Sequence, residues 1–166
     1  MSRRSERGQA LTEFAVVIPL FLLLAFGTFD VARVVWANNS LANAAREGAR
    51  QAIVHGGSDT TACPYGPQEP DAVTVAATAS CPYPAPSREA IRVIARNAAV
   101  AGGTNLVVSV CYGAGCNGDD DVPGATNVRG TAVTVRVTSD VELVTASLLG
   151  LGAFSLSGSS TMLVNH

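Results

Sequence analysis

The chain has 166 residues, of which 48% are hydrophobic and 14% charged, and its formal net charge is −2. Soluble domains usually carry about 25% charged residues, so this deficit indicates that part of the chain lies in lipid or against other subunits. The small negative charge gives no electrostatic basis for binding nucleic acid. All 11 basic residues are arginine, which excludes the Schiff-base and phosphate-loop chemistry that depends on lysine.

The N-terminus combines a basic leader with an apolar run. Residues 1–8 read MSRRSERG, and the stretch from Phe14 to Phe29 is uncharged. This run is just under the minimum of about 17 residues for a spanning helix, and apolar neighbours on both sides extend it. We therefore predict a transmembrane segment at about 11–30. The positive-inside rule places the leader in the cytoplasm and the rest of the chain outside.

A cleavable secretory signal is the first alternative to a permanent anchor. The triplet at residues 42–44, Ala-Asn-Ala, has the form that signal peptidase accepts. It lies far beyond the apolar core, however, and Asp30 and Arg33 intervene, which does not match the three-part signal pattern. We therefore disfavour ordinary signal-peptidase cleavage.

A different processing site lies at the end of the leader. Gly8 is followed by Gln9-Ala10-Leu11-Thr12-Glu13-Phe14 and then the apolar run. This arrangement resembles the type IV prepilin processing site, in which a prepilin peptidase cuts after the glycine on the cytoplasmic face. The resemblance implies a mature chain that begins at Gln9.

Glu13 has two interpretations, because an ionisable group at the edge of an apolar helix is costly and usually has a partner. The resemblance implies that Glu13, beside the aromatic Phe14, pairs with the free N-terminal amine of another subunit during assembly. The alternative is that Glu13 only marks the boundary between lipid and water.

The helical pattern continues from Ala10 to Val54, where only Pro19 and Gly27 interrupt it and Pro19 predicts a kink. A helix of this length is about 65 Å long, so residues 31–55 must project outside the membrane. This half is amphipathic, and its apolar stripe requires a sheet to cover it. The predicted stripe comprises Val31, Val34, Val35, Leu41, Ala42, Ala45, Ala49 and Ile53.

Residues 7–54, which include LANAAREGARQAIV at 41–54, resemble the TadE-like family. These are small pseudopilins of the tight-adherence (Tad) pilus apparatus. The resemblance implies a structural pseudopilin or minor pilin without a cofactor, which acts in surface attachment. Its implied partners are the inner membrane, a prepilin peptidase and other pilin and pseudopilin subunits. Arg46, Glu47 and Arg50 read as a solvated helix face.

Four cysteines, Cys63, Cys81, Cys111 and Cys116, follow the apolar segment. An even number of cysteines outside the cytoplasm predicts two disulfides. Three pairings are possible, and Cys63–Cys81 with Cys111–Cys116 is the simplest because each pair is local in sequence. A zinc site is the alternative, but the spacing lacks a C-x-x-C pair.

The remainder, 56–166, predicts an extracytoplasmic domain. Residues from Gly56 to Ser87 read as a loop that Cys63–Cys81 would close, and Ser87 can cap a short second helix. The predicted elements are a helix at Arg88–Val100, strands at Leu106–Tyr112, Thr131–Thr138 and Phe154–Val164, and a short helix or turn at Leu143–Leu151. The predicted fold class is α+β with a pilin-like layout: a long N-terminal helix packed on a small antiparallel sheet.

Few residues suggest a catalytic or metal-binding role. The acidic run Asp119–Asp121 reads as a solvated loop, with calcium binding as the alternative, although the spacing is not that of an EF-hand. The histidines, His55 and His166, belong to no recognisable catalytic motif. We therefore expect a protein that is not an enzyme and has no metal site. The competing functions are an unprocessed membrane-anchored scaffold or adhesin and, with least support, an anchored hydrolase.

Overall fold

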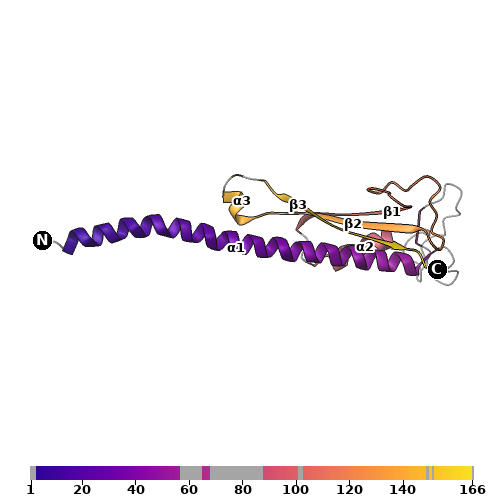
Figure 1. Ribbon diagram of the computed structural model, residues 1–166, viewed down its shortest axis with the longest axis horizontal. Helices are drawn as coiled ribbons and strands as arrows, with labels where there is room; N and C mark the ends of the chain where they lie inside the picture. The colour runs from indigo at the N-terminus through magenta and orange to yellow at the C-terminus, as the bar shows by residue number, and fades with distance from the viewer. Residues whose placement is uncertain are drawn as a thin grey trace.

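A computed structural model describes residues 3–56, 65–67, 88–100, 103–148, 150 and 152–165, with side chains from Gln9 onward. Its dominant element is α1 (Arg3–Val54), a helix of 52 residues that is about 78 Å long at 1.5 Å per residue. The helix remains continuous through Pro19 and is only gently bowed (Figure 1). It begins earlier than the sequence predicts, because the described part of the leader continues the helix.

The other elements form a small domain along the C-terminal half of α1 (Figure 1). The described elements are α2 (Glu89–Ala98), β1 (Thr104–Tyr112), β2 (Ala132–Val141), α3 (Val144–Leu148) and β3 (Phe154–Leu163). The strands form an antiparallel sheet in the order β1-β2-β3. The predicted α+β fold class is confirmed, with a long apolar helix, a three-stranded sheet and short additional helices.

One face of the sheet packs on the helices. Alternate residues of a strand point to opposite faces, and Val133, Val135 and Val137 of β2 are fully buried. Strands β2 and β3 contact α1, whereas β1 contacts α2. The buried core comprises Leu41, Ala44, Ala45, Ala49, Ala52, Ile91, Ala95, Ala99, Val108, Val110, Tyr112, Val133, Val135, Val137 and Val164.

The face of α1 that enters this core differs from the predicted stripe. Val31 and Val35, which the predicted stripe includes, are exposed, whereas Ala37 and Ala44, which it omits, are buried. The buried positions are mostly alanine, because a small side chain lets the sheet approach the helix closely. The predicted stripe was therefore wrong at its N-terminal end, where side-chain size decides the packing more than hydrophobicity does.

Several element boundaries also differ from prediction: α2 spans Glu89–Ala98 rather than Arg88–Val100, β1 begins before Leu106, and β2 ends at Val141 rather than Thr138. β1 begins at Thr104, two residues earlier than predicted. Within it, Asn105 adopts a left-handed conformation (φ 55°) at an irregularity in the pairing, a conformation that asparagine tolerates. Helix α2 follows Arg88 without a side-chain cap. The proposed cap, Ser87, lies outside the described residues.

The connection from β1 to β2 contains a local cross-link. Cys111 and Cys116 are joined in a disulfide across 5 residues. The proposed Cys63–Cys81 pair and most of the predicted loop at 56–87 lie outside the described part of the chain. Their pairing therefore stays a prediction.

Candidate assembly surface: the exposed half of the long helix

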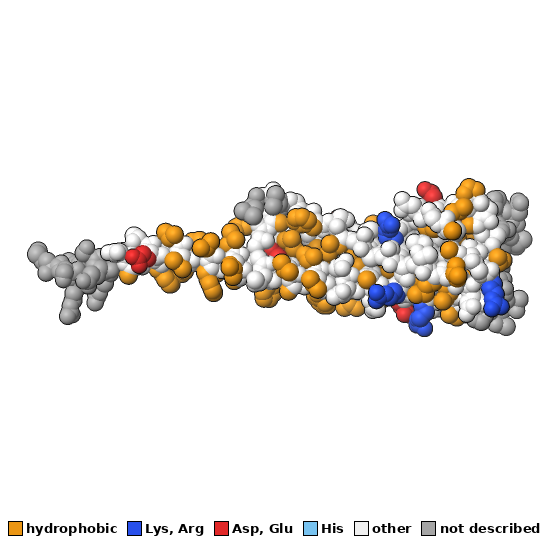
Figure 2. Space-filling model, viewed as in Figure 1, with side chains coloured by type: hydrophobic (Ala, Val, Ile, Leu, Met, Phe, Trp, Pro, Cys, Tyr) orange, Lys and Arg blue, Asp and Glu red, His pale blue; other side chains and the backbone are white. Residues whose placement is uncertain are grey.

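The N-terminal half of α1 is covered by apolar side chains with no domain packed against most of it (Figure 2). Within the described residues, Gln9–Val54 is the one helix long and apolar enough to cross a bilayer. The exposed large apolar side chains of this half are Leu11, Phe14, Val16, Val17, Leu20, Phe21, Leu22, Leu23, Leu24, Phe26, Phe29, Val31, Val35 and Trp36. A helix that is apolar on all sides requires lipid or other helices around it, so this helix fits a single-pass membrane anchor.

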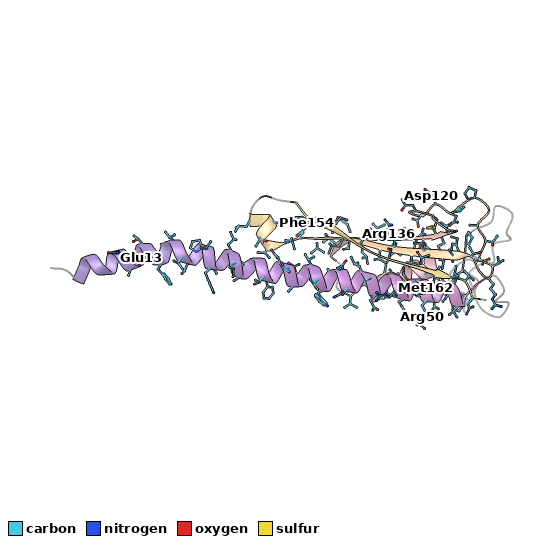
Figure 3. All side chains as sticks on the ribbon, viewed as in Figure 1. Glu13, Arg50, Asp120, Arg136, Phe154 and Met162 are labelled. Atoms are coloured by element: carbon cyan, nitrogen blue, oxygen red, sulfur yellow. A yellow bond between two sulfur atoms is a disulfide. The ribbon has the colours of Figure 1, made fainter. Side chains whose placement is uncertain are left out.

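Glu13 lies near the free end of this surface, far from the domain (Figure 3). Its Oε1 accepts a hydrogen bond from Gln9 Nε2, one turn earlier, at 3.3 Å. Phe14 is also exposed. The structure therefore brings Gln9, Glu13 and Phe14 together on one accessible stretch of helix.

Gly8 and Gln9 lie within the regular helix. The peptide bond between them is thus in its second turn, preceded by the helical residues of the leader. A peptidase that cuts here must first unwind this turn, and glycine makes that easier because it has low helix propensity.

Sequence reasoning missed the role of Asp30, which it treated only as the charge that ends the apolar run. Its side chain is 3% exposed. The carboxylate accepts hydrogen bonds from the Val144 N–H at 3.0 Å, the Thr145 N–H at 2.7 Å and the Thr145 hydroxyl at 2.5 Å. The first turn of a helix leaves N–H groups unsatisfied, and Asp30 supplies their acceptor from a distant part of the chain. It thereby attaches α3 to α1 where the apolar half of the helix ends.

We expect Asp30→Ala to destabilise this junction by about 2 kcal/mol, because it removes the charge-assisted hydrogen bonds that the Val144 and Thr145 N–H groups donate. Hydrogen exchange of the Val144 and Thr145 amides in the detergent-solubilised chain should accelerate. Thr145→Val serves as the matched control, since it removes only the hydroxyl bond and should leave amide protection largely intact. Unchanged amide exchange in Asp30→Ala would contradict the assigned role.

At the opposite end of the domain, two carboxylates of the acidic run hold β1 and α2 together. Asp119 accepts a hydrogen bond from the Val110 N–H at 2.9 Å and pairs with Arg92 at 2.9 Å. Asp121 accepts one from the Tyr112 N–H at 2.7 Å and forms a salt bridge with Arg88. The run is largely exposed, as a solvated loop would be, but the sequence did not predict these contacts of Asp119 and Asp121.

These contacts also set the charge of Asp119. Partial burial raises the pKa of its carboxyl, but the Val110 N–H and the Arg92 guanidinium outweigh burial and hold the pKa below its usual range. The group is thus ionised at neutral pH and engaged by protein donors. In the described part of the chain, no three histidine, cysteine or acidic side chains gather in a geometry that would hold a metal ion.

Of the two histidines, which the sequence assigns to no catalytic motif, the structure describes His55. The His55 ring packs against Tyr65 with ring centroids 4.6 Å apart, next to the end of α1. His166 lies outside the described residues.

Arg50 pairs with Glu47 at 2.6 Å on the side of α1 away from the sheet (Figure 3), as expected for a solvated face. This pair holds the pKa of Glu47 below its usual range.

The fold and the exposed helix together define a class: a small α+β domain carried on one long helix with an acidic residue near its N-terminus. The family model for TadE-like proteins matches residues 8–50, which confirms the resemblance seen in the sequence. The match covers the exposed half of α1 and most of the half that packs on the sheet. TadE-like proteins are structural and pilus-associated. No curated protein and no solved structure matches the chain.

Proposed function

We propose that the chain is a structural pseudopilin or minor pilin-like subunit for assembly of a Tad-type pilus. A prepilin peptidase cuts it between Gly8 and Gln9, residues 11–30 hold it in the inner membrane, and its domain lies outside the cytoplasm. One observation carries this proposal. Half of α1 is apolar on all sides and largely uncovered by the other described residues, yet it presents Glu13 near its end.

Assembly follows from pairing between subunits. Cleavage creates a positively charged amine at Gln9, one helical turn from Glu13. In a bundle of chains offset along the helix axis, the Glu13 carboxylate of one chain reaches the Gln9 amine of the next. Such a pair is screened little in lipid, and it sets the axial register because either charge left unpaired in a low-dielectric environment is costly. Phe14 beside it supplies apolar contact area.

The domain is suited to the outer side of the membrane. The Cys111–Cys116 disulfide closes a short turn next to β1, and disulfides persist in oxidising compartments. We propose that Cys63 and Cys81 form a second bridge there. Together with the apolar anchor and the absence of any lysine, these features favour a packing role over catalysis.

Gly8→Leu should retain residues 1–8 in the membrane-extracted protein, because the peptidase site requires a minimal side chain there. Intact-mass measurement and N-terminal sequencing report the result directly. Gly27→Leu is the matched control: it lies in the same helix, a Cβ there meets no atom within 4 Å, and the chain should still begin at Gln9. A wild-type chain that begins at Met1 in a strain with active peptidase would rule out processing.

An unprocessed, permanently anchored scaffold or adhesin is the second candidate. The observation in its favour is that α1 runs without a break from Arg3 through the Gly8–Gln9 bond, which leaves that bond in regular helix. The same N-terminal measurement distinguishes the two functions. An intact leader keeps the arginines on the cytoplasmic side and prevents the amine at Gln9 from forming.

A further inference from the structure

The base of the domain lies beside the middle of α1, where the apolar half of the helix meets the half that packs on the sheet (Figure 1). This base consists of α3 and the first residues of β3. Phe154 marks it in Figure 3, at the end of the domain closest to Glu13. The acidic loop around Asp120 lies at the other end.

The position of this base relative to the bilayer follows from Asp30. The proposed membrane segment, 11–30, has about 20 residues and so spans about 30 Å, which equals the thickness of the hydrocarbon core. Asp30 is the last residue of that segment, and it binds the first turn of α3 directly. Val144 and Thr145 are therefore held at the level where the hydrocarbon core ends.

Three large apolar side chains are exposed at this level, beside polar ones such as Ser147 and Ser155. Val144 is 50% exposed, Leu148 75% and Phe154 47%. Phe154 and Gly158 lie four residues apart in β3, so they are on the same face of the sheet. Because Gly158 packs on α1, this is the face that is turned toward the helix.

Charged side chains are few in this region: Glu142 precedes α3, and Arg33 lies one turn beyond Asp30 on α1. The chain from Leu143 to Asn165 contains no aspartate, glutamate, lysine or arginine. On the face shown in Figure 2, arginine side chains gather over the distal part of the domain, whereas apolar side chains continue from the free helix onto its base. The one buried charge nearby, Asp30, accepts three hydrogen bonds, so it is not left unsatisfied in an apolar environment.

We propose that this base is a lipid-binding surface: Val144, Leu148 and Phe154 enter the boundary between headgroups and acyl chains of the outer leaflet. This inference rests on the proposed membrane anchor and extends it. Apolar side chains at such a boundary are stabilised by the area that they remove from water. The surface is continuous with the apolar anchor, and the two together fix the height of the domain above the membrane.

Fluorescence quenching by lipid tests the proposal, because Trp36 is the single tryptophan. In a Trp36→Phe background, Leu148→Trp provides the probe and Val128→Trp, exposed in the β1–β2 connection, provides the control. The full chain is placed in phosphatidylcholine vesicles with or without bromine on the upper acyl chain. We expect bromine to reduce the emission of the Leu148→Trp probe by at least about twofold, as for side chains buried at the interface, and to leave that of Val128→Trp unchanged.

A third probe separates this inference from the anchor on which it rests. Phe21→Trp, in the apolar half of α1, should be quenched if that helix spans the bilayer. Quenching of Phe21→Trp without quenching of Leu148→Trp would overturn the lipid-binding surface and leave the anchor standing. Loss of both signals would overturn both proposals. A blue-shifted Leu148→Trp emission that bromine does not quench and that depends on protein concentration would mean that another copy of the chain covers the base, which also overturns the inference.

Discussion

Gly158→Ala is expected to lower the free energy of unfolding of the domain by on the order of 3 kcal/mol, the upper range for overpacking a close contact. A Cβ at this position would lie 2.5 Å from the Ala42 nitrogen and 2.5 Å from the Leu41 carbonyl carbon. Both are backbone atoms of α1, so no side-chain rotation relieves the clash. Strand β3 must move away from the helix, and the core between them opens.

Thermal unfolding of the detergent-solubilised chain, followed by the β-sheet signal, measures this effect. A loss of that size corresponds to a fall in Tm of roughly 6–12 °C for a protein of this length. Gly152→Ala is the matched control, since a Cβ there meets no atom within 4 Å, and its effect should stay within about 0.5 kcal/mol. Equal melting temperatures for the two variants would show that β3 does not approach α1 as closely as described.

Glu13→Leu should abolish assembly while leaving insertion and cleavage intact. Insertion should be as good as in the wild type or better, because a charge leaves an apolar helix. Cleavage should persist because Gly8 is untouched. Assembly should fail because, in the proposed pairing, the Gln9 amine of the neighbouring chain loses its carboxylate partner in a low-dielectric environment.

The experiment requires a strain that lacks the native copy, with cleavage, membrane level and filament formation measured on the same cells. Glu47→Leu is the matched control, because it removes a carboxylate from the same helix but breaks only a surface pair with Arg50, and such pairs contribute little. It should assemble normally. Normal filaments from well-expressed Glu13→Leu would contradict the pairing and show that Glu13 only marks the boundary between lipid and water.

Local patterns in the sequence were sufficient to predict the kinds of element and their order. The uncharged run after the leader and the helical periodicity beyond it specify α1, because both depend only on neighbouring residues. Alternation of Val133, Val135 and Val137 with polar residues specifies a strand with one buried face. Gly8, Gln9 and Glu13 were found in the same way, since the proposed processing and pairing depend on a short contiguous motif.

The tertiary structure alone decided which residues of these elements meet. Asp30 binds Val144 and Thr145 across more than 100 residues, and Gly158 touches the backbone at Leu41. Neither contact leaves a periodic signal, because each depends on a single residue and on the distance between two elements. For the same reason the buried face of α1 was misplaced at Val31 and Val35. Hydrophobicity determines that a helix has a buried face, but the closest approach of the sheet, set by alanine and glycine, determines where that face lies.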